Sequence, residues 1–251
     1  MSNAALFTTV AREYADFRPG YPPELFEWLA RVSPAHAAVW DAGCGSGQAS
    51  AALAELFSIV HATDVAAEQI AAAKPHPRIR YAVAPAEACG LPDASVDLVT
   101  VAQALHWFDV EAFYAEARRV ARPEALLVVW NYPRPVFDEP ALDAVFQNFY
   151  SNVVGPYWPA GRKHVEANYT TLPFPQPELP HPPFCLDLDW SFSQVIGYVS
   201  SWSATAGYRA ARGADPVPLL ADSLRKSWPD DTPARLRMPL GMRVAKIGAR
   251  R

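Results

Sequence analysis

Three glycines at alternate positions, Gly43, Gly45 and Gly47, form the stretch of this chain best suited to ligand chemistry. The short apolar run 37–40 precedes them and predicts a buried strand, and 49–56 is rich in helix formers. Glycine takes the backbone angles that a sharp strand-to-helix turn needs, and it lets a ligand approach the main chain closely. Free N–H groups at the helix start attract a polar or anionic ligand. The pattern therefore favours a nucleotide-type cofactor site over an ordinary loop.

The residues around the turn narrow the choice of cofactor. The dinucleotide fingerprint G-x-G-x-x-G needs a glycine where this chain has Gln48. A phosphate loop needs a lysine after its last glycine, and none follows Gly47. The turn therefore matches neither of these phosphate-binding patterns.

Val39, Asp41 and the three glycines also fit the pattern hydrophobic-x-[DE]-x-G-x-G-x-G. This stretch resembles motif I of class I S-adenosylmethionine-dependent methyltransferases. The resemblance implies that the loop, with Cys44 inside it, passes under the methionine part and the ribose of S-adenosyl-L-methionine. It also implies that Asp41 holds the loop and the amino end of the cofactor. Because this cofactor has no phosphate, the turn needs no lysine or arginine.

An acidic residue, Asp64, ends the next predicted strand, 58–64, and lies 17 residues past Gly47. The second strand of a nucleotide-binding βαβ unit delivers a carboxylate at about this place, where it accepts hydrogen bonds from the ribose hydroxyls. The alternative is an N-cap for a helix over 66–73, a role that aspartate also performs. With the glycine turn already in place, we favour the ribose role and assign the adjacent Val65 to the same site.

The third predicted strand, 80–83, leads into a loop, 84–92, that resembles the adenine loop G-D-A-E-x-L-P of the same family. Pro85 stands where that family often has an aspartate in contact with the adenine amino group. The resemblance therefore assigns the adenine contact to the backbone at Ala86 and to Glu87.

Three further candidates follow the fourth predicted strand, 95–101. Open α/β sheets bind ligands at the carboxyl ends of their strands. We expect Gln103 to line the cofactor side, and His106 and Trp107 to face the methyl group. His106 suits a general base because imidazole titrates near neutral pH. A histidine hydrogen-bonded to the backbone beneath the site is an equal alternative.

Near the N-terminus, the aromatic segment 14–22 contains Arg18. Its pattern, Tyr-x-x-Phe-Arg-Pro-x-Tyr-Pro, resembles the N-terminal arm of the trans-aconitate-methyltransferase-like group, and the chain is similar to the type 11 methyltransferases as well. The resemblance implies a lid over the cofactor pocket, in which Arg18 pairs its planar guanidinium with a carboxylate of cofactor or substrate. An arm whose aromatics only cover a core edge is an equal alternative.

The order of predicted elements indicates an α/β fold. Strands alternate with helices up to an unbroken apolar strand at 126–130, which is typical of a mostly parallel sheet with helices on both faces. The resemblance implies a Rossmann-like class I methyltransferase with a seven-stranded sheet and a helical cap inserted after strand five. We therefore divide the chain into an N-terminal arm and lid helix at 1–35, a cofactor-binding core at 36–131, and a substrate cap with the last strands at 132–251.

Within the cap, hydrophobic spacing predicts helices over 141–150, 193–203 and 216–228. Strands are predicted at 186–190 and 238–247.

Composition limits the function classes. The 251 residues carry a net charge of −4 with 19% charged side chains, which gives no basic surface for nucleic acid or an anionic membrane. No stretch has the length of a membrane span, and no signal peptide is recognisable. Three cysteines without metal-ligand spacing fit a reducing compartment. We expect a cytoplasmic monomer or homodimer that binds a small-molecule substrate and no metal.

Together these patterns predict methyl transfer from S-adenosylmethionine to a carboxylate or hydroxyl oxygen of a small molecule. A carboxylate acceptor needs no base and would be oriented by a cation such as Arg18, whereas a hydroxyl acceptor would make His106 the base. Two alternatives remain. One is a non-catalytic binder of the same cofactor, and the other is an NAD-dependent enzyme of related topology, against which Gln48 argues.

Overall fold

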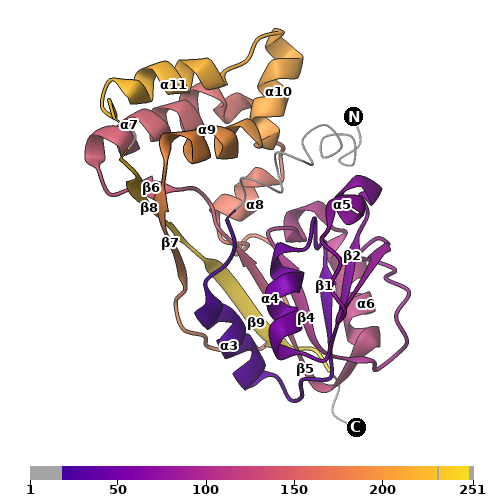
Figure 1. The fold of residues 1–251 in the computed structure, drawn as a ribbon. Helices are drawn as coiled ribbons and strands as arrows, with labels where there is room; N and C mark the ends of the chain where they lie inside the picture. The colour runs from indigo at the N-terminus through magenta and orange to yellow at the C-terminus, as the bar shows by residue number, and fades with distance from the viewer. Residues whose placement is uncertain (1–18, 231, 249–251) are drawn as a thin grey trace. The chain divides into compact units, whose positions relative to one another are not determined.

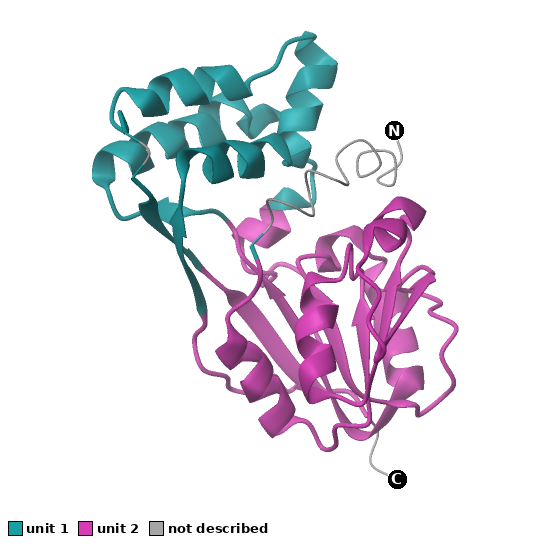
Figure 2. Cartoon of the chain, in the orientation of Figure 1, with its two compact units in different colours: residues 1–19, 134–162, 185–238 teal, residues 20–133, 163–184, 239–251 magenta. Residues whose placement is uncertain are grey.

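The computed structural model describes residues 19–230 and 232–248. Contacts divide the chain into two compact units, coloured magenta and teal in Figure 2. The magenta unit, called here the sheet unit, contains Gly20–Pro133, Lys163–Phe184 and the residues from Pro239 onward. The teal unit, called here the helical unit, contains Arg134–Arg162 and Cys185–Met238. The glycine turn and all described candidate site residues belong to the sheet unit.

The sheet unit is built on one mostly parallel sheet (Figure 1). Its strands lie in the spatial order β3 (Ile79–Val83), β2 (Ile59–Asp64), β1 (Ala38–Ala42), β4 (Val96–Ala102), β5 (Ala121–Asn131) and β9 (Gly241–Lys246). The first five are parallel, and β9 runs antiparallel to β5. The strand order reverses between β1 and β4, and ligands bind at such a switch point in open α/β sheets.

Helices cover both faces of this sheet, as predicted. Alternate residues of a strand point to opposite faces, so neighbouring strand residues enter different hydrophobic clusters. Val39 packs with α3 (Pro23–Val32) and α4 (Gln48–Leu56), whereas Trp40 packs with α6 (Val110–Val120) on the opposite face. Burial on both faces explains the unbroken apolar run Leu126 to Trp130 of β5.

The prediction of seven strands in this sheet was wrong, because the described part of the chain places six there. The strands β6 (Val136–Phe137), β8 (Ala234–Pro239) and β7 (Cys185–Trp190) form a separate sheet in the order β6-β8-β7. In β8, buried Leu236 and Met238 alternate with exposed Arg235 and Arg237. Such a strand suits a sheet with one solvated face, whereas β9 is buried along almost its whole length and fits beside β5.

The helical unit packs its helices around aromatic side chains. It contains α7 (Pro140–Asn148), the π-helical turn η2 (Phe149–Val153), the 3-10 turn η3 (Gly155–Tyr157), α9 (Phe192–Ser200), α10 (Ser203–Arg212) and α11 (Val217–Arg225). The Trp202 ring lies 5.3–5.6 Å from the rings of Phe146, Tyr150, Trp158 and Tyr198. These aromatics therefore form the core of this unit.

The single helix predicted over 193–203 was wrong, since α9 ends at Ser200 and α10 begins at Ser203. The Ser201 hydroxyl donates a hydrogen bond to the carbonyl of Tyr198 over 2.6 Å. Trp202 then adopts extended backbone angles and precedes α10 as its N-cap residue. Serine competes in this way for backbone carbonyls and bends or ends helices. Within the described ranges, no helix is both long and apolar enough to cross a membrane.

Candidate active site

The glycine turn connects β1 to α4 and has no room for side chains at two of its positions. Gly43 and Gly47 have φ angles of +67° and +91°, a region that L-residues avoid. A Cβ atom on Gly43 would lie 2.6 Å from Cβ of Ala104, and one on Gly47 would meet the hydroxyl of Tyr81. The turn is therefore pressed between the segment after β4 and the strand β3.

Asp41 anchors the glycine turn to the sheet through hydrogen bonds. Its side chain is fully buried, and its two oxygens accept hydrogen bonds from the hydroxyls of Ser50 (2.6 Å) and Thr100 (3.0 Å). Ser50 lies on α4 and Thr100 on β4, so the Asp41 carboxyl joins three elements. Burial raises the pKa of Asp41 from 3.8 to about 6, and the nearby Asp64 charge adds to this shift.

This raised pKa gives a testable dependence of stability on pH. Between pH 3.8 and about 6 the folded protein holds the Asp41 proton that the unfolded chain releases, so the free energy of unfolding decreases as pH rises. Relative to Asp41→Asn, the wild type is expected to lose about 2–3 kcal/mol of stability across this window. Urea denaturation of both proteins from pH 4 to 7 measures the difference, and parallel curves would contradict it.

Asp64 at the end of β2 is bound to the same turn. Its Oδ2 accepts from the N–H of Gly45 and its Oδ1 from the N–H of Ala66, each at 2.9 Å. The helix that follows, α5 (Ala67–Ala72), has Ala66 as its N-cap without a side-chain cap bond, so Asp64 does not take the alternative N-cap position. Desolvation raises the pKa of Asp64, whereas its backbone hydrogen bonds oppose the rise.

The loop after β3 holds the predicted adenine contacts. Ala86 is buried, and the Glu87 carboxylate accepts a 2.8 Å hydrogen bond from the backbone N–H of Asp109. Asp109 is the N-cap residue of α6, so Glu87 ties this loop to the start of that helix.

Inside the glycine turn Cys44 is also buried, and desolvation together with the neighbouring carboxylates raises the pKa of its thiol.

Gln103 occupies the first position after β4 (Val96–Ala102) and has a φ of +59°, which is unusual for a residue with a side chain. Its amide forms two hydrogen bonds with the backbone of Tyr132, donating to the carbonyl at 3.1 Å and accepting from the N–H at 3.0 Å. Gln103 thus ties together the chain segments that leave the carboxyl ends of β4 and β5.

His106 and Trp107 lie in the short 3-10 turn η1 (Leu105–Trp107) and are both half-buried. Their rings are 4.8 Å apart, and Nδ1 of His106 is 3.1 Å from the hydroxyl of Tyr169. The imidazole is thus bonded to another side chain. Arg18 lies outside the described residues, as does most of the predicted lid arm.

Sequence reasoning missed Tyr169 and the residues that hold it. Tyr169 lies 63 residues from His106, in a segment where no family resemblance was found. A signal was present in β9, where Arg243 interrupts the apolar run Met242 to Ala245. A charge in a buried strand needs a partner, and the Arg243 guanidinium pairs with Glu178 at 2.6 Å.

Comparison with known proteins identifies the family to which this chain belongs. A family model described as a methyltransferase domain matches residues 40–129. A methyltransferase-named protein of Dictyostelium discoideum is 31% identical over 225 residues, which cover 88% of this chain and 86% of the relative. The chain belongs to the class I S-adenosylmethionine-dependent methyltransferases.

Two further comparisons agree with this assignment of the methyltransferase. A solved structure from Anaeromyxobacter dehalogenans, which bears the name type II methyltransferase, is 47% identical and superposes with a TM-score of 0.85. That alignment covers 93% of the present chain and 100% of the solved one. A methyltransferase of Mycobacterium tuberculosis is 37% identical over 127 residues, which cover 50% of this chain and 51% of that protein. S-Adenosylmethionine is therefore the cofactor, in place of the nicotinamide alternative.

The residues around the turn suit this cofactor. S-Adenosylmethionine presents hydrogen-bond donors, namely an ammonium group, two ribose hydroxyls and an adenine amino group, and the site presents acceptors. Asp64 provides a carboxylate, and the buried Oε1 of Gln69 has no hydrogen-bond partner among the described residues. That oxygen lies 3.9 Å from the position of a Cβ on Gly45. Val65, with 63% of its surface exposed beside Asp64, offers apolar cover for a ring.

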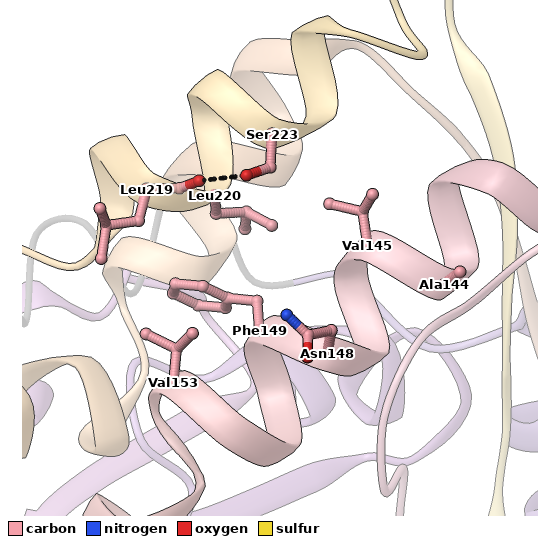
Figure 3. A pocket seen from close by; sticks show the side chains of 8 residues that line it. All are labelled: Ala144, Val145, Asn148, Phe149, Val153, Leu219, Leu220 and Ser223. Atoms are coloured by element: carbon pink, nitrogen blue, oxygen red, sulfur yellow. Dashed lines mark hydrogen bonds between the residues drawn. The ribbon is translucent and has the colours of Figure 1, made fainter.

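A separate cavity of about 360 Å³ lies within the helical unit (Figure 3). Its lining residues come from α7, η2 and α11, and they are Ala144, Val145, Asn148, Phe149, Val153, Leu219, Leu220 and Ser223. The Ser223 hydroxyl is bonded to the carbonyl of Leu219 in its own helix, so the lining is mostly apolar. The volume falls at the lower end of the range for small-molecule pockets, roughly 300–1,000 Å³.

No three His, Cys, Asp or Glu side chains of the described residues form a group that could hold a metal.

Proposed function

We propose that this methyltransferase transfers the methyl group to an oxygen atom, hydroxyl or carboxylate, of a small molecule in the cytoplasm. The observation that carries the proposal is the position of His106, just past the carboxyl end of β4 and hydrogen-bonded to Tyr169. An imidazole there can remove the proton of a hydroxyl acceptor near neutral pH. The absence of a net positive charge supports a small acceptor over a nucleic acid.

Site residues take separate roles in this proposal. Asp64 and Val65 hold the adenosine, the loop from Gly43 to Gly47 with Asp41 behind it carries the methionine part, and the remaining contacts come from Ala86, Glu87 and Gln103. Positioning supplies most of the acceleration of an in-line methyl displacement. A carboxylate acceptor would need no base and would be oriented by a cation such as Arg18.

One relative supports an oxygen atom as the methyl acceptor. A protein of Methylovorus named malonyl-[acyl-carrier protein] O-methyltransferase is 37% identical over 117 residues, which cover 41% of this chain and 40% of that protein. Its name specifies methylation at oxygen. The matched part is limited, so the relative supports an oxygen acceptor and no particular substrate.

The test is to measure release of S-adenosylhomocysteine with a panel of small phenols and carboxylic acids. For a hydroxyl acceptor, His106→Gln is expected to lower kcat by roughly a hundredfold with a smaller effect on KM, because the general base is lost. For a carboxylate acceptor, the same substitution should leave kcat nearly unchanged. Binding of S-adenosylmethionine without turnover on any oxygen acceptor would instead support a non-catalytic binder.

A further inference from the structure

Two consecutive residues after α8 (Arg162–Glu166) adopt a conformation that side chains disfavour. Asn168 and Tyr169 have φ angles of +51° and +61°, in the left-handed region. For a bulky residue such as tyrosine this conformation is an outlier. Strained backbone of this kind persists only where surrounding structure holds it, and it is concentrated at functional sites.

The sheet unit holds this turn from several sides. The Nη1 group of Arg243, on β9, donates to the carbonyls of Tyr169 (2.7 Å) and Leu172 (2.8 Å). Glu178 binds the other edge of the same guanidinium at 3.1 and 2.6 Å. The guanidinium carbon also lies 4.4 Å from the centre of the Phe174 ring. A buried cation therefore holds the main chain at two places in this segment, the carbonyls of Tyr169 and Leu172.

Two further contacts complete the support, one through the backbone of Tyr169 and one through the side chain of Asn168. The N–H of Tyr169 donates to the carbonyl of His164 over 2.7 Å. The Asn168 side chain occupies the space that a Cβ on Gly241 would take, so only glycine fits at that position of β9.

The segment held in this conformation places the hydroxyl of Tyr169 next to His106. The Tyr169 side chain is completely buried, and its hydroxyl lies 3.1 Å from Nδ1 of His106. The imidazole has the Trp107 ring at 4.8 Å and the Tyr169 ring at 6.0 Å, centre to centre. The planes of these two rings make angles of 40° and 30°, respectively, with the imidazole plane.

We propose that Tyr169 is a positioning residue that fixes the ring orientation and the tautomer of His106. A tyrosine hydroxyl can donate to an unprotonated nitrogen or accept from a protonated one, and we assign the second arrangement, in which Nδ1–H of His106 donates to the Tyr169 hydroxyl oxygen. Nε2 then carries no proton and can take one from a hydroxyl of the substrate. This last consequence rests on the proposed function, whereas the effect of Tyr169 on the tautomer does not.

The test is nitrogen-15 NMR of the histidine rings in the full chain, without cofactor or substrate, for wild type and Tyr169→Phe. The phenylalanine keeps the buried ring and removes the hydroxyl. The ratio of the Nδ1–H tautomer of His106 to the Nε2–H tautomer is expected to fall by roughly threefold to tenfold, which corresponds to one neutral hydrogen bond. Tyr114→Phe is the matched control, since it removes a buried hydroxyl bonded to the carbonyl of Pro173 at 2.9 Å, and it should leave the His106 ratio unchanged.

An unchanged tautomer ratio in Tyr169→Phe would overturn the proposal. If that variant does not fold, 3,5-difluorotyrosine at position 169 keeps the ring and makes the hydroxyl more acidic. The Nδ1 resonance of His106 should then shift, and an unshifted resonance would equally overturn the proposal. Because these measurements involve no turnover, they give an answer even if His106→Gln shows that His106 is not the base.

Discussion

Gly47→Ala is expected to reduce binding of S-adenosylmethionine below detection and to lower the free energy of unfolding by roughly 2–4 kcal/mol. The φ of +91° at Gly47 strains any residue with a side chain, and the added Cβ would meet the hydroxyl and ring of Tyr81. Relief requires that the turn or Tyr81 move. A moved turn shifts the start of α4 and the Gly45 N–H that binds Asp64. Calorimetric titration with S-adenosylhomocysteine and urea denaturation measure the two effects.

Gly213→Ala separates the effect of backbone strain from that of the steric clash with Tyr81. Gly213, which follows α10 in the helical unit, also has a positive φ, +66°, but no atom lies within 4 Å of its Cβ position. This variant should show the smaller loss of stability that comes from strain alone, with cofactor binding intact. Tyr81→Leu combined with Gly47→Ala should recover part of the lost stability, and the cycle of single and double variants isolates that coupling. Normal cofactor affinity in Gly47→Ala would contradict the assignment of the turn.

The parts of the site that could be predicted are those encoded by local spacing. The glycine turn needs a strand before it and a helix after it, and all three lie within 37–56. Asp64 could be placed because the end of the next strand meets the same edge of a parallel sheet. In the structure its carboxylate is bonded to Gly45 within that turn. Short-range periodicity is sufficient where consecutive elements are also neighbours in space.

The parts that could not be predicted depend on contacts between distant segments. Tyr169 reaches His106 from a proline-interrupted segment that has neither helical nor strand periodicity, and its conformation is set by Arg243, a further 74 residues along the chain. Which sheet a strand near the C-terminus joins also depends on the strands with which it pairs. A strand with one polar face, such as β8, and a strand buried on both faces, such as β9, follow each other with one residue between them. Only the burial of each face shows that they separate into two sheets.

Asp64→Ala is expected to weaken binding of S-adenosylmethionine by roughly a hundredfold to a thousandfold. A hydrogen bond to a charged group contributes ~1.5–3 kcal/mol, and the carboxylate is assigned to two ribose hydroxyls. The substitution also removes the acceptors of the Gly45 and Ala66 N–H groups, so the turn loses its anchor on β2. Asp64→Asn keeps one oxygen acceptor without the charge and should fall between wild type and alanine. Glu68→Gln, on the exposed surface of α5, removes a nearby charge and should leave the affinity unchanged.

The pH dependence of cofactor binding distinguishes the effect of the Asp64 charge from the effect of its side-chain shape. Burial raises the pKa of Asp64 above 3.8, and the ionised form is the stronger acceptor for ribose hydroxyls. As pH falls through this raised pKa, wild-type affinity should decline, and the decline should begin at a higher pH than for an ordinary aspartate. Asp64→Asn has no proton to gain there, so its profile should keep only the smaller change that comes from Asp41, whose pKa is about 6. Calorimetric titrations between pH 4.5 and 8 compare the two, and the same decline in both proteins would show that another group, and not Asp64, controls binding of the ribose.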